Sequence, residues 1–293
     1  HLGYRPNTLA RAMITGKSRI VGVLIAYLEN QFYPNALEML NDAFQERGYR
    51  IMLFMVSNED DVASTVEDLL SYQVEGIITA SVGMSNEIAT MCSDARIPVV
   101  MFNRGQDTGD HAQVTSDNVE GGRTVAHFLA SGGHKKIAHI SGWSGSSTGR
   151  DRMRGFVEGL EQHGLAPCAT EDGMYRQDRA AAIARAMCST TDRPDAIFVG
   201  NDHMAFAVMD TLRFELGLSI PEDISVVGYD DVPIAAWPAY NLTTVRQPIR
   251  QMVTATVDML MSRIEEPHPA EHMRIPGPLK IRGSARIPKG FGR

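Results

Sequence analysis

The strongest constraint on the fold is the alternation of short apolar, β-branched runs with amphipathic helical stretches along the chain. The run IVGVLIA at 20–26 is apolar almost throughout, which is typical of a parallel strand covered on both faces. In the stretch that follows, Leu37, Leu40 and Phe44 recur at helical spacing and define one apolar face. Because parallel strands need crossover connections, this alternation predicts an α/β fold with doubly wound parallel sheets.

The alternation runs through two successive sets, so we predict two lobes. The first set comprises strands at 20–26, 50–56, 76–80 and 99–102 with helices at 34–47, 62–71 and 86–94. After a helix around 122–129, the second set comprises strands at 137–141, 196–199 and 224–229, helices at 150–163, 179–187 and 203–216, a long helix at 249–264, and short strands near 273–275 and 280–282. We assign 1–19 to a hinge helix and linker, 20–132 plus 248–271 to an N-terminal lobe, and 133–247 plus 272–293 to a C-terminal lobe.

No linker rich in Pro, Gly or Ser separates the two sets, so we expect hinge crossovers between the lobes. Ligands of open α/β sheets bind beyond the carboxyl ends of the strands. If these edges of two lobes face each other, they line a cleft. The architecture therefore predicts a ligand clamp.

The composition is that of a soluble globular protein, with 43% hydrophobic and 22% charged residues. No apolar run reaches the roughly 18 residues of a membrane span, and residues 1–19 do not resemble a secretory signal. The cysteines are Cys92, Cys168 and Cys188, without a CxxC pair. We expect free thiols and a cytoplasmic location.

The charge is unevenly distributed. The formal net charge is −7, yet residues 1–19 carry four basic side chains and no acidic one, which leaves −11 for the remainder. An acidic body does not bind a phosphate backbone, whereas a basic arm can. Any nucleic-acid contact is therefore expected at the N-terminus.

Two stretches resemble enzyme motifs but do not fulfil all of their requirements. Gly16-Lys17-Ser18 resembles the end of a phosphate-binding loop, but Arg11 occupies the position of its first glycine. Residues 145–149 satisfy the GxSxG pattern of hydrolases, and Asp230 and then His268 or His272 follow in hydrolase order. However, residues 142–144 intervene between the predicted strand and this motif, whereas a nucleophile elbow turns directly from strand to helix. We favour a chance match in a loop of small residues and predict no enzyme activity.

Histidines do not form a metal site in the sequence. His134 and His139 lack an acidic or cysteine neighbour at ligand spacing, and His268 and His272 lie in a proline-rich tail. We interpret all four as solvated surface residues and predict neither metal nor cofactor.

The N-terminal segment can form a short helix. Asn7 can cap it, and Leu9 and Met13 lie four residues apart on one face. So short a helix is marginal alone in water and orders when something docks it. The alternative is an ordinary leading arm packed on a lobe.

The segment GYRPNTLARAM at 3–13, followed by TGKS at 15–18, resembles the hinge-helix segment of the lactose-repressor (LacI/GalR) family. Further matches follow in order: NQFY at 30–33, EGII at 75–78, IPVV at 97–100, DN at 117–118, GG at 121–122, GHKKI at 133–137, RMRGF at 152–156, ND at 201–202, ISVVGYDD at 224–231, LTTV at 242–245 and RGS at 282–284. The resemblance covers almost the whole chain. It implies the type I periplasmic-binding-protein-like fold and a dimeric, ligand-responsive transcriptional regulator.

The family carries a helix-turn-helix domain ahead of the hinge helix, whereas this sequence begins at His1 within the connecting segment. We therefore expect the chain to be the effector-binding core, with weak operator affinity of its own. A periplasmic sugar-binding protein of a transport system is the alternative, although the basic arm does not fit it.

The resemblance implies a small effector, a sugar or sugar acid, bound by Asp117, Arg152, Asn201 and Asp230. Carboxylates, an amide and a guanidinium fork suit vicinal hydroxyls. The alternatives are helix or turn caps for Asp117, Asn201 and Asp230, and a surface ion pair for Arg152.

Further candidates are aromatic residues that could cover a pyranose face and polar residues at strand ends. These are Tyr27, Phe32, Tyr175, Trp237, Ser81, Asn103 and Arg104. A buried core position is the alternative for the aromatic residues, Trp237 in particular.

In the family, the effector changes the angle between the lobes of a dimer and repositions paired hinge helices in the DNA minor groove. The matching positions are Asn7, Leu9, Ala10 and Met13, with Met13 as the apolar side chain inserted at a base step. Neither the effector nor the direction of its effect on DNA binding follows from the sequence.

Overall fold

The computed structural model describes residues 17–56, 61–82, 86–106 and 111–291. The chain divides into two compact units. Unit 1 holds His1–Leu28, Tyr33–Thr115 and Ile249–Met273, and unit 2 holds Glu29–Phe32, Ser116–Pro248 and Arg274–Arg293. Among the described helices, none is long and apolar enough to cross a membrane.

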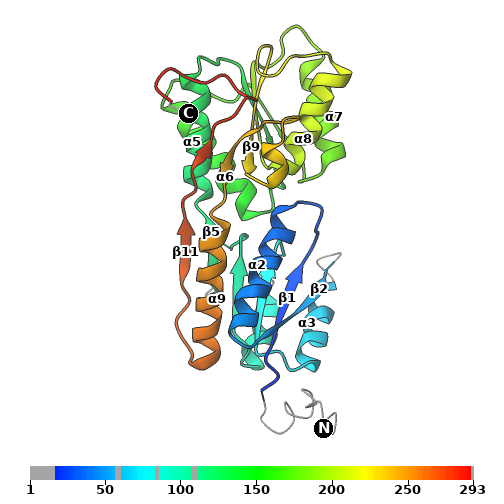
Figure 1. The fold of residues 1–293 in the computed structure, drawn as a ribbon, viewed down its shortest axis with the longest axis vertical. Coiled ribbons are helices and arrows are strands. Elements are labelled where there is room, and N and C mark those ends of the chain that lie inside the picture. The colour runs from blue at the N-terminus through cyan, green and yellow to red at the C-terminus, as the bar shows by residue number, and fades with distance from the viewer. Residues whose placement is uncertain (1–16, 57–60, 83–85, 107–110, 292–293) are drawn as a thin grey trace, which may run out of the picture. The chain divides into compact units, whose positions relative to one another are not determined.

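Unit 1 is built on a six-stranded sheet with the order β11-β5-β4-β3-β1-β2 (Figure 1). Its strands are β1 (Ile20–Ile25), β2 (Arg50–Met55), β3 (Gly76–Ala80), β4 (Val99–Phe102), β5 (Ala112–Ser116) and β11 (His272–Ile275). The strands from β2 to β5 pair in parallel. The helices are α2 (Phe32–Glu46), α3 (Asp61–Ser71), α4 (Asn86–Asp94) and α9 (Ile249–Glu265). Fully buried Leu24, Leu69, Ile77 and Met101 form part of the core.

Unit 2 repeats this topology with the order β12-β10-β9-β8-β6-β7. Its strands are β6 (Ile137–Ser141), β7 (Ala169–Asp172), β8 (Ala196–Val199), β9 (Ser225–Asp230), β10 (Thr243–Arg246) and β12 (Leu279–Lys280). The strands from β7 to β10 are parallel, and β12 is antiparallel to β10. The helical segments are α5 (Asn118–Ser131), α6 (Ser147–Glu161), α7 (Gln177–Cys188), α8 (Asp202–Asp210), the π-helical turn η1 (Thr211–Glu215) and the 3-10 turn η2 (Pro233–Ala236).

In both sheets the first strand lies between the second and the third, so the strand order reverses there. This reversal is a topological switch point, located between β1 and β3 in unit 1 and between β6 and β8 in unit 2. The predicted pair of α/β lobes with parallel sheets is confirmed. The chain passes between the units after Thr115, after Pro248 and after Met273, besides the short excursion at 29–32.

The predicted boundary at 132 is wrong, because residues 116–132 belong to unit 2. Helix α5 packs against α6 through glycines. A Cβ atom on Gly155 would lie 1.8 Å from the backbone oxygen of Val119, and one on Gly122 would lie 2.2 Å from that of Arg152. The sequence pattern identified α5 as a helix but did not show which lobe this close approach joins it to.

Three strands were missed, namely β5, β7 and β10. Their sequences, AQVTS, ATED and TTVR, are short and polar. Strand β7 is an edge strand with two exposed residues, so it needs no apolar alternation. The predicted single helix at 203–216 consists of two segments, because α8 ends at Asp210 and the π-helical turn η1 follows.

The interpretation of His134 and His139 as surface residues is wrong, because both are fully buried. His139 lies within β6, with its ring stacked on Phe198 at 4.6 Å and its Nδ1 2.9 Å from the Phe198 carbonyl oxygen. Burial lowers the pKa of His139 to about 4.

Among the described residues, no group of three or more His, Cys, Asp or Glu side chains could hold a metal ion. The three cysteines are free thiols, as predicted.

Candidate ligand-binding site

Arg152 is a buried cation of unit 2 that several segments contact. It is 2% exposed and projects from the first half of α6. Its Nε donates a hydrogen bond to Asn118 Oδ1 at 2.8 Å, and its Nη1 donates one to the Gly200 carbonyl at 2.6 Å. The guanidinium also lies 3.7 Å from the centroid of the Tyr229 ring. These contacts from three separate segments fix the direction of the guanidinium.

Asp230 ends β9 beside this arginine and is also buried. Its Oδ2 accepts a hydrogen bond from Asn30 Nδ2 at 3.0 Å, and its Oδ1 accepts one from Gln247 Nε2 at 2.7 Å. Arg152 Nη2 lies 3.7 Å from Oδ1, so the two charges attract each other without a direct hydrogen bond. Burial raises the pKa of Asp230, and Arg152 and the two amide donors oppose that rise.

The backbone that carries Asp230 is strained. Asp230 has a φ angle of 122° and Asp231 one of 57°, both in the region that favours glycine. The Asp231 carboxylate is held between Arg246 Nε and Arg282 Nη2, each at 2.5 Å. Strained backbone of this kind clusters at ligand sites and persists only where neighbouring contacts hold it. The two arginines therefore help to hold the turn that presents Asp230.

A second buried carboxyl group supports the same turn. Asp202 accepts hydrogen bonds from the Val232 backbone N–H at 3.0 Å and from the Thr244 hydroxyl at 2.6 Å. Burial raises its pKa well above the ordinary value, and the nearby charge of Asp230 adds to the rise. Asn201, which precedes it, is 1% exposed, and its Oδ1 caps α8 by accepting from the Met204 N–H at 3.0 Å.

In unit 1, polar residues gather at the carboxyl ends of β1, β3 and β4. Ser81 and Asn103 follow β3 and β4 directly, with φ angles of 64° and 68°. Arg104 Nη1 donates to the Ser81 carbonyl at 2.6 Å, and Ser81 Oγ accepts from the Ala26 N–H at 3.0 Å. The carboxyl edge of this sheet therefore also combines left-handed backbone with buried polar side chains.

The side-chain oxygen of Asn103 is a candidate acceptor for a ligand at these strand ends. Its Nδ2 donates to the Tyr33 hydroxyl at 3.1 Å, and Tyr33 packs edge-on against Tyr27 with ring centroids 5.3 Å apart. Its Oδ1 is buried and has no hydrogen-bond partner among the described residues. A buried acceptor of this kind is costly unless a ligand or water satisfies it.

Both units thus present charged, amide and aromatic groups at the carboxyl ends of parallel strands. A family model, the periplasmic binding protein-like domain, matches residues 125–285. The chain is 30% identical over 291 residues to the ribose operon repressor of Escherichia coli, covering 97% of this chain and 87% of the relative. The chain belongs to the lactose-repressor (LacI) family of transcriptional regulators. This membership favours a regulator over a periplasmic transport protein.

Other members are similar over comparable lengths. The HTH-type transcriptional repressor PurR of Aliivibrio salmonicida is 28% identical over 273 residues, which is 91% of this chain and 81% of the relative. Among solved structures, the lac repressor dimer bound to operator and the anti-inducer ONPF is 25% identical with a TM-score of 0.86, covering 97% of this chain and 99% of that chain. The transcriptional regulator CelR–cellobiose complex is 26% identical with a TM-score of 0.83, covering 97% of this chain and 87% of that chain.

Of the predicted site residues in unit 2, Arg152 and Asp230 lie side by side, whereas Asp117 caps a helix. Gly200, which precedes Asn201, accepts from Arg152. Asp117 instead caps α5, because its Oδ1 accepts from the Glu120 N–H at 3.1 Å. Its neighbour Asn118 is the residue that reaches Arg152.

The aromatic candidates of the predicted site differ in their burial and in their contacts. Phe32 is buried, and its N–H donates to Oδ1 of Asn30, which in turn binds Asp230. The Tyr175 ring packs on Gly142, where a Cβ atom would lie 2.0 Å from its Cζ, and its hydroxyl lies 2.9 Å from Thr148 Oγ1. Trp237 is 56% exposed, which excludes the alternative of a buried core position.

Three residues of the site were missed, namely Asn30, Asn118 and Gln247. Each is an amide side chain that holds Arg152 or Asp230. Asn30 and Asn118 lie in segments that resemble the family, which was an available signal. Gln247 follows a strand that was itself missed, so the pattern gave no reason to select it.

The hydrolase motif takes a structural role. Ser146 caps α6, with its Oγ accepting from the Gly149 N–H at 3.1 Å, and the central serine of the motif, Ser147, begins the helix. Strand β6 ends earlier, at Ser141, so the direct strand-to-helix turn of a nucleophile elbow is absent from this described segment.

Proposed function

We propose that this regulator responds to a small polyhydroxylated effector, a sugar or sugar acid, that contacts Arg152 and Asp230 in unit 2. The observation that carries the proposal is the buried Arg152–Asp230 pair beside a strained turn. Buried ion pairs contribute little net stability, because desolvation offsets their attraction. A role in ligand recognition gives a reason for the pair and the strain together.

The chemistry of the pair suits neighbouring hydroxyl groups. A carboxylate accepts from a hydroxyl, and a guanidinium donates to the oxygen next to it. Within unit 2, we propose Asn201 as a further polar contact, with Phe32, Tyr175 and Trp237 as apolar faces for a sugar ring. Within unit 1, we propose Asn103, Arg104 and Tyr27 as effector-binding residues at the ends of its strands. The names of similar proteins agree with this class, since they include a ribose operon repressor and a regulator in complex with cellobiose.

We propose further that the effector controls operator binding by a homodimer without any catalytic step. Asn7, Leu9, Ala10 and Met13, the predicted hinge residues, lie outside the described residues. Their proposed contact with the minor groove rests on the resemblance of this segment to the hinge helix. The similar lac repressor structure is a dimer bound to operator, which supports this assembly.

A thermal-shift screen of neutral sugars, sugar acids and nucleosides identifies the effector class, because a ligand that binds the folded state raises the melting temperature. Calorimetry then measures the affinity of the best ligand for Arg152→Lys and Asp230→Asn. We expect each variant to lose at least about 2 kcal/mol of binding free energy, since each loses a charge-assisted or bidentate contact.

Arg154→Lys is the matched control, because Arg154 lies on the same helix with an exposed side chain that pairs with Asp151. Near-native affinity in both Arg152→Lys and Asp230→Asn would refute the assignment of the site. Turnover of esters or glycosides that disappears in Ser147→Ala would instead support the hydrolase alternative.

A further inference from the structure

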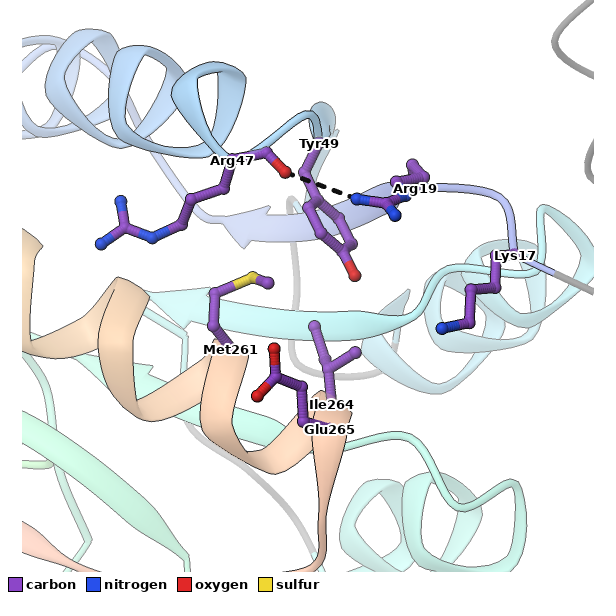
Figure 2. Close-up of a pocket in the computed structure, with 7 residues that line it drawn as sticks. All are labelled: Lys17, Arg19, Arg47, Tyr49, Met261, Ile264 and Glu265. Atoms are coloured by element: carbon purple, nitrogen blue, oxygen red, sulfur yellow. Dashed lines mark hydrogen bonds between the residues drawn. The ribbon is translucent and has the colours of Figure 1, made fainter.

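Unit 1 contains a cavity at the amino ends of its strands β1 and β2, opposite to the ends that carry Ser81 and Asn103. It has a volume of about 520 Å³ and is lined by Lys17, Arg19, Arg47, Tyr49, Met261, Ile264 and Glu265 (Figure 2). Arg19 and Tyr49 directly precede β1 and β2, and the other side of the cavity is the last turn of α9. The volume falls within the range of small-molecule sites, roughly 300–1,000 Å³.

The cavity is lined by cationic and apolar side chains. Its lining includes three cations, Lys17, Arg19 and Arg47, while Glu265 contributes an opposing carboxylate. Tyr49, Met261 and Ile264 contribute the apolar surface (Figure 2). Asp258 neutralises Arg47 and Glu75 contacts Tyr49, so an anion is attracted locally by Arg19 rather than by a net charge of the region.

Arg19 is the cation most available to a ligand. Its backbone has a φ angle of 57°, and its guanidinium lies over the Tyr49 ring, 5.3 Å from the centroid. Its one side-chain hydrogen bond among the described residues is a long one, from Nη1 to the Arg47 carbonyl oxygen at 3.5 Å. The Arg47 guanidinium, by contrast, is engaged by Asp258 at 2.6 Å and by the Ala43 carbonyl at 3.0 Å.

The aromatic wall is held rigidly. The Tyr49 hydroxyl donates to Glu75 Oε2 at 3.0 Å, and Glu75 Oε1 accepts from the Arg19 backbone N–H at 2.6 Å. Burial and the contact with Glu75 raise the pKa of Tyr49 to about 12, so its phenol stays neutral. The ring therefore presents a fixed, uncharged face beside the Arg19 guanidinium.

We propose that this cavity binds a small organic anion that carries a phosphate or carboxylate group on a compact apolar body. The anionic group contacts Arg19 with support from Lys17, and the apolar body lies against Tyr49, Met261 and Ile264. None of these residues belongs to the effector site proposed above. Lys17 directly follows residues 1–16 in the sequence, the segment that resembles the hinge helix, so we propose that a ligand here influences DNA binding.

Phenyl phosphate and inorganic phosphate are suitable probes, with benzyl alcohol as the uncharged comparison. Calorimetry on the whole chain should show saturable binding of phenyl phosphate. We expect Arg19→Gln to weaken it at least about tenfold, because a charge-assisted contact is lost. Ile264→Asn should weaken phenyl phosphate while leaving inorganic phosphate unchanged.

Arg50→Gln is the matched control, because Arg50 is exposed on β2 and does not line the cavity. Arg152→Lys separates the two sites and should leave phenyl phosphate binding unchanged. Thermal melts verify that each variant is folded. Three results would overturn the proposal: no saturable binding of either anion at millimolar concentration, equal weakening in Arg50→Gln, or an Arg19→Gln variant that loses affinity for duplex DNA while its phosphate binding is unaltered.

Discussion

Arg152 and Asp230 show how a charged pair can be both costly and well held. Each is at most 5% exposed, and each has its own hydrogen-bond partners, namely Asn118 and Gly200 for the arginine and Asn30 and Gln247 for the aspartate. Removing one charge leaves the other buried without compensation, and such losses are typically about 3–5 kcal/mol. The two residues are therefore expected to be strongly coupled.

Arg152→Met should lower the free energy of unfolding by about 3 kcal/mol, because Asp230 then remains buried without its counter-charge. Adding Asp230→Asn should cost less in this background than in the wild type, because there it removes the carboxylate that Arg152→Met leaves uncompensated. Urea unfolding of the four proteins of this double-mutant cycle measures the coupling. Additive effects of the two substitutions would mean that the pair does not interact.

The buried His139 leads to a prediction about how stability depends on pH. Its folded pKa of about 4 lies below the ordinary value of 6.5, so the unfolded chain takes up a proton before the folded protein does. Its contribution to stability is thus complete above about pH 6.5 and is lost as the pH falls towards about 4.

Between about pH 7 and about pH 5, this group alone should remove on the order of 2 kcal/mol of unfolding free energy. His139→Gln should be less stable than the wild type near neutral pH, and the gap should narrow on acidification. Urea unfolding at both pH values tests this, with His268→Gln as the control because His268 is exposed. Parallel pH profiles for the wild type and His139→Gln would contradict it.

At the scale of elements, α5 and α6 act as one packed pair that positions the site. Their axes approach closely because glycines lie where the backbones meet. Cβ atoms on Gly122, Gly155 and Gly159 would lie 2.2 Å from the Arg152 carbonyl oxygen, 1.8 Å from the Val119 carbonyl oxygen and 2.7 Å from the Ala126 Cβ, respectively. Since α5 carries Asn118 and α6 carries Arg152, this spacing sets the 2.8 Å hydrogen bond between them.

Gly155→Ala should therefore destabilise unit 2 by at least about 2 kcal/mol, because the new methyl group meets rigid backbone rather than a movable side chain. It should also weaken effector binding by displacing Arg152. Thermal and urea unfolding measure the first effect and calorimetry the second. Glu161→Ala, at an exposed position of the same helix, is the control and should change stability by less than about 0.5 kcal/mol.

At the scale of the whole molecule, the two units share one topology. In each, a switch point lies beside the first strand, and the polar strand ends described above gather at the carboxyl edge of the sheet. The cavity of unit 1 lies at the amino ends of β1 and β2. A regulator built in this way has room for two chemically different ligands, one at the carboxyl ends and one at the amino ends of its strands.

We expect the chain to form homodimers. Sedimentation velocity at micromolar concentration should give a mass about twice the 32.2 kDa of one chain. A monomer at all concentrations tested would count against the dimeric assembly.

The sequence by itself determined the fold class, because runs such as that at 20–26 and the helical spacing of Leu37, Leu40 and Phe44 reflect local burial on one or both faces. The sequence also indicated Arg152 and Asp230 as candidate effector-binding residues. Only the tertiary structure decided that residues 116–132 belong to unit 2, that His139 is buried, and that Asn118 rather than Asp117 contacts Arg152. These outcomes depend on contacts between segments far apart in the chain, such as Asn30 with Asp230, which hydrophobic periodicity does not encode.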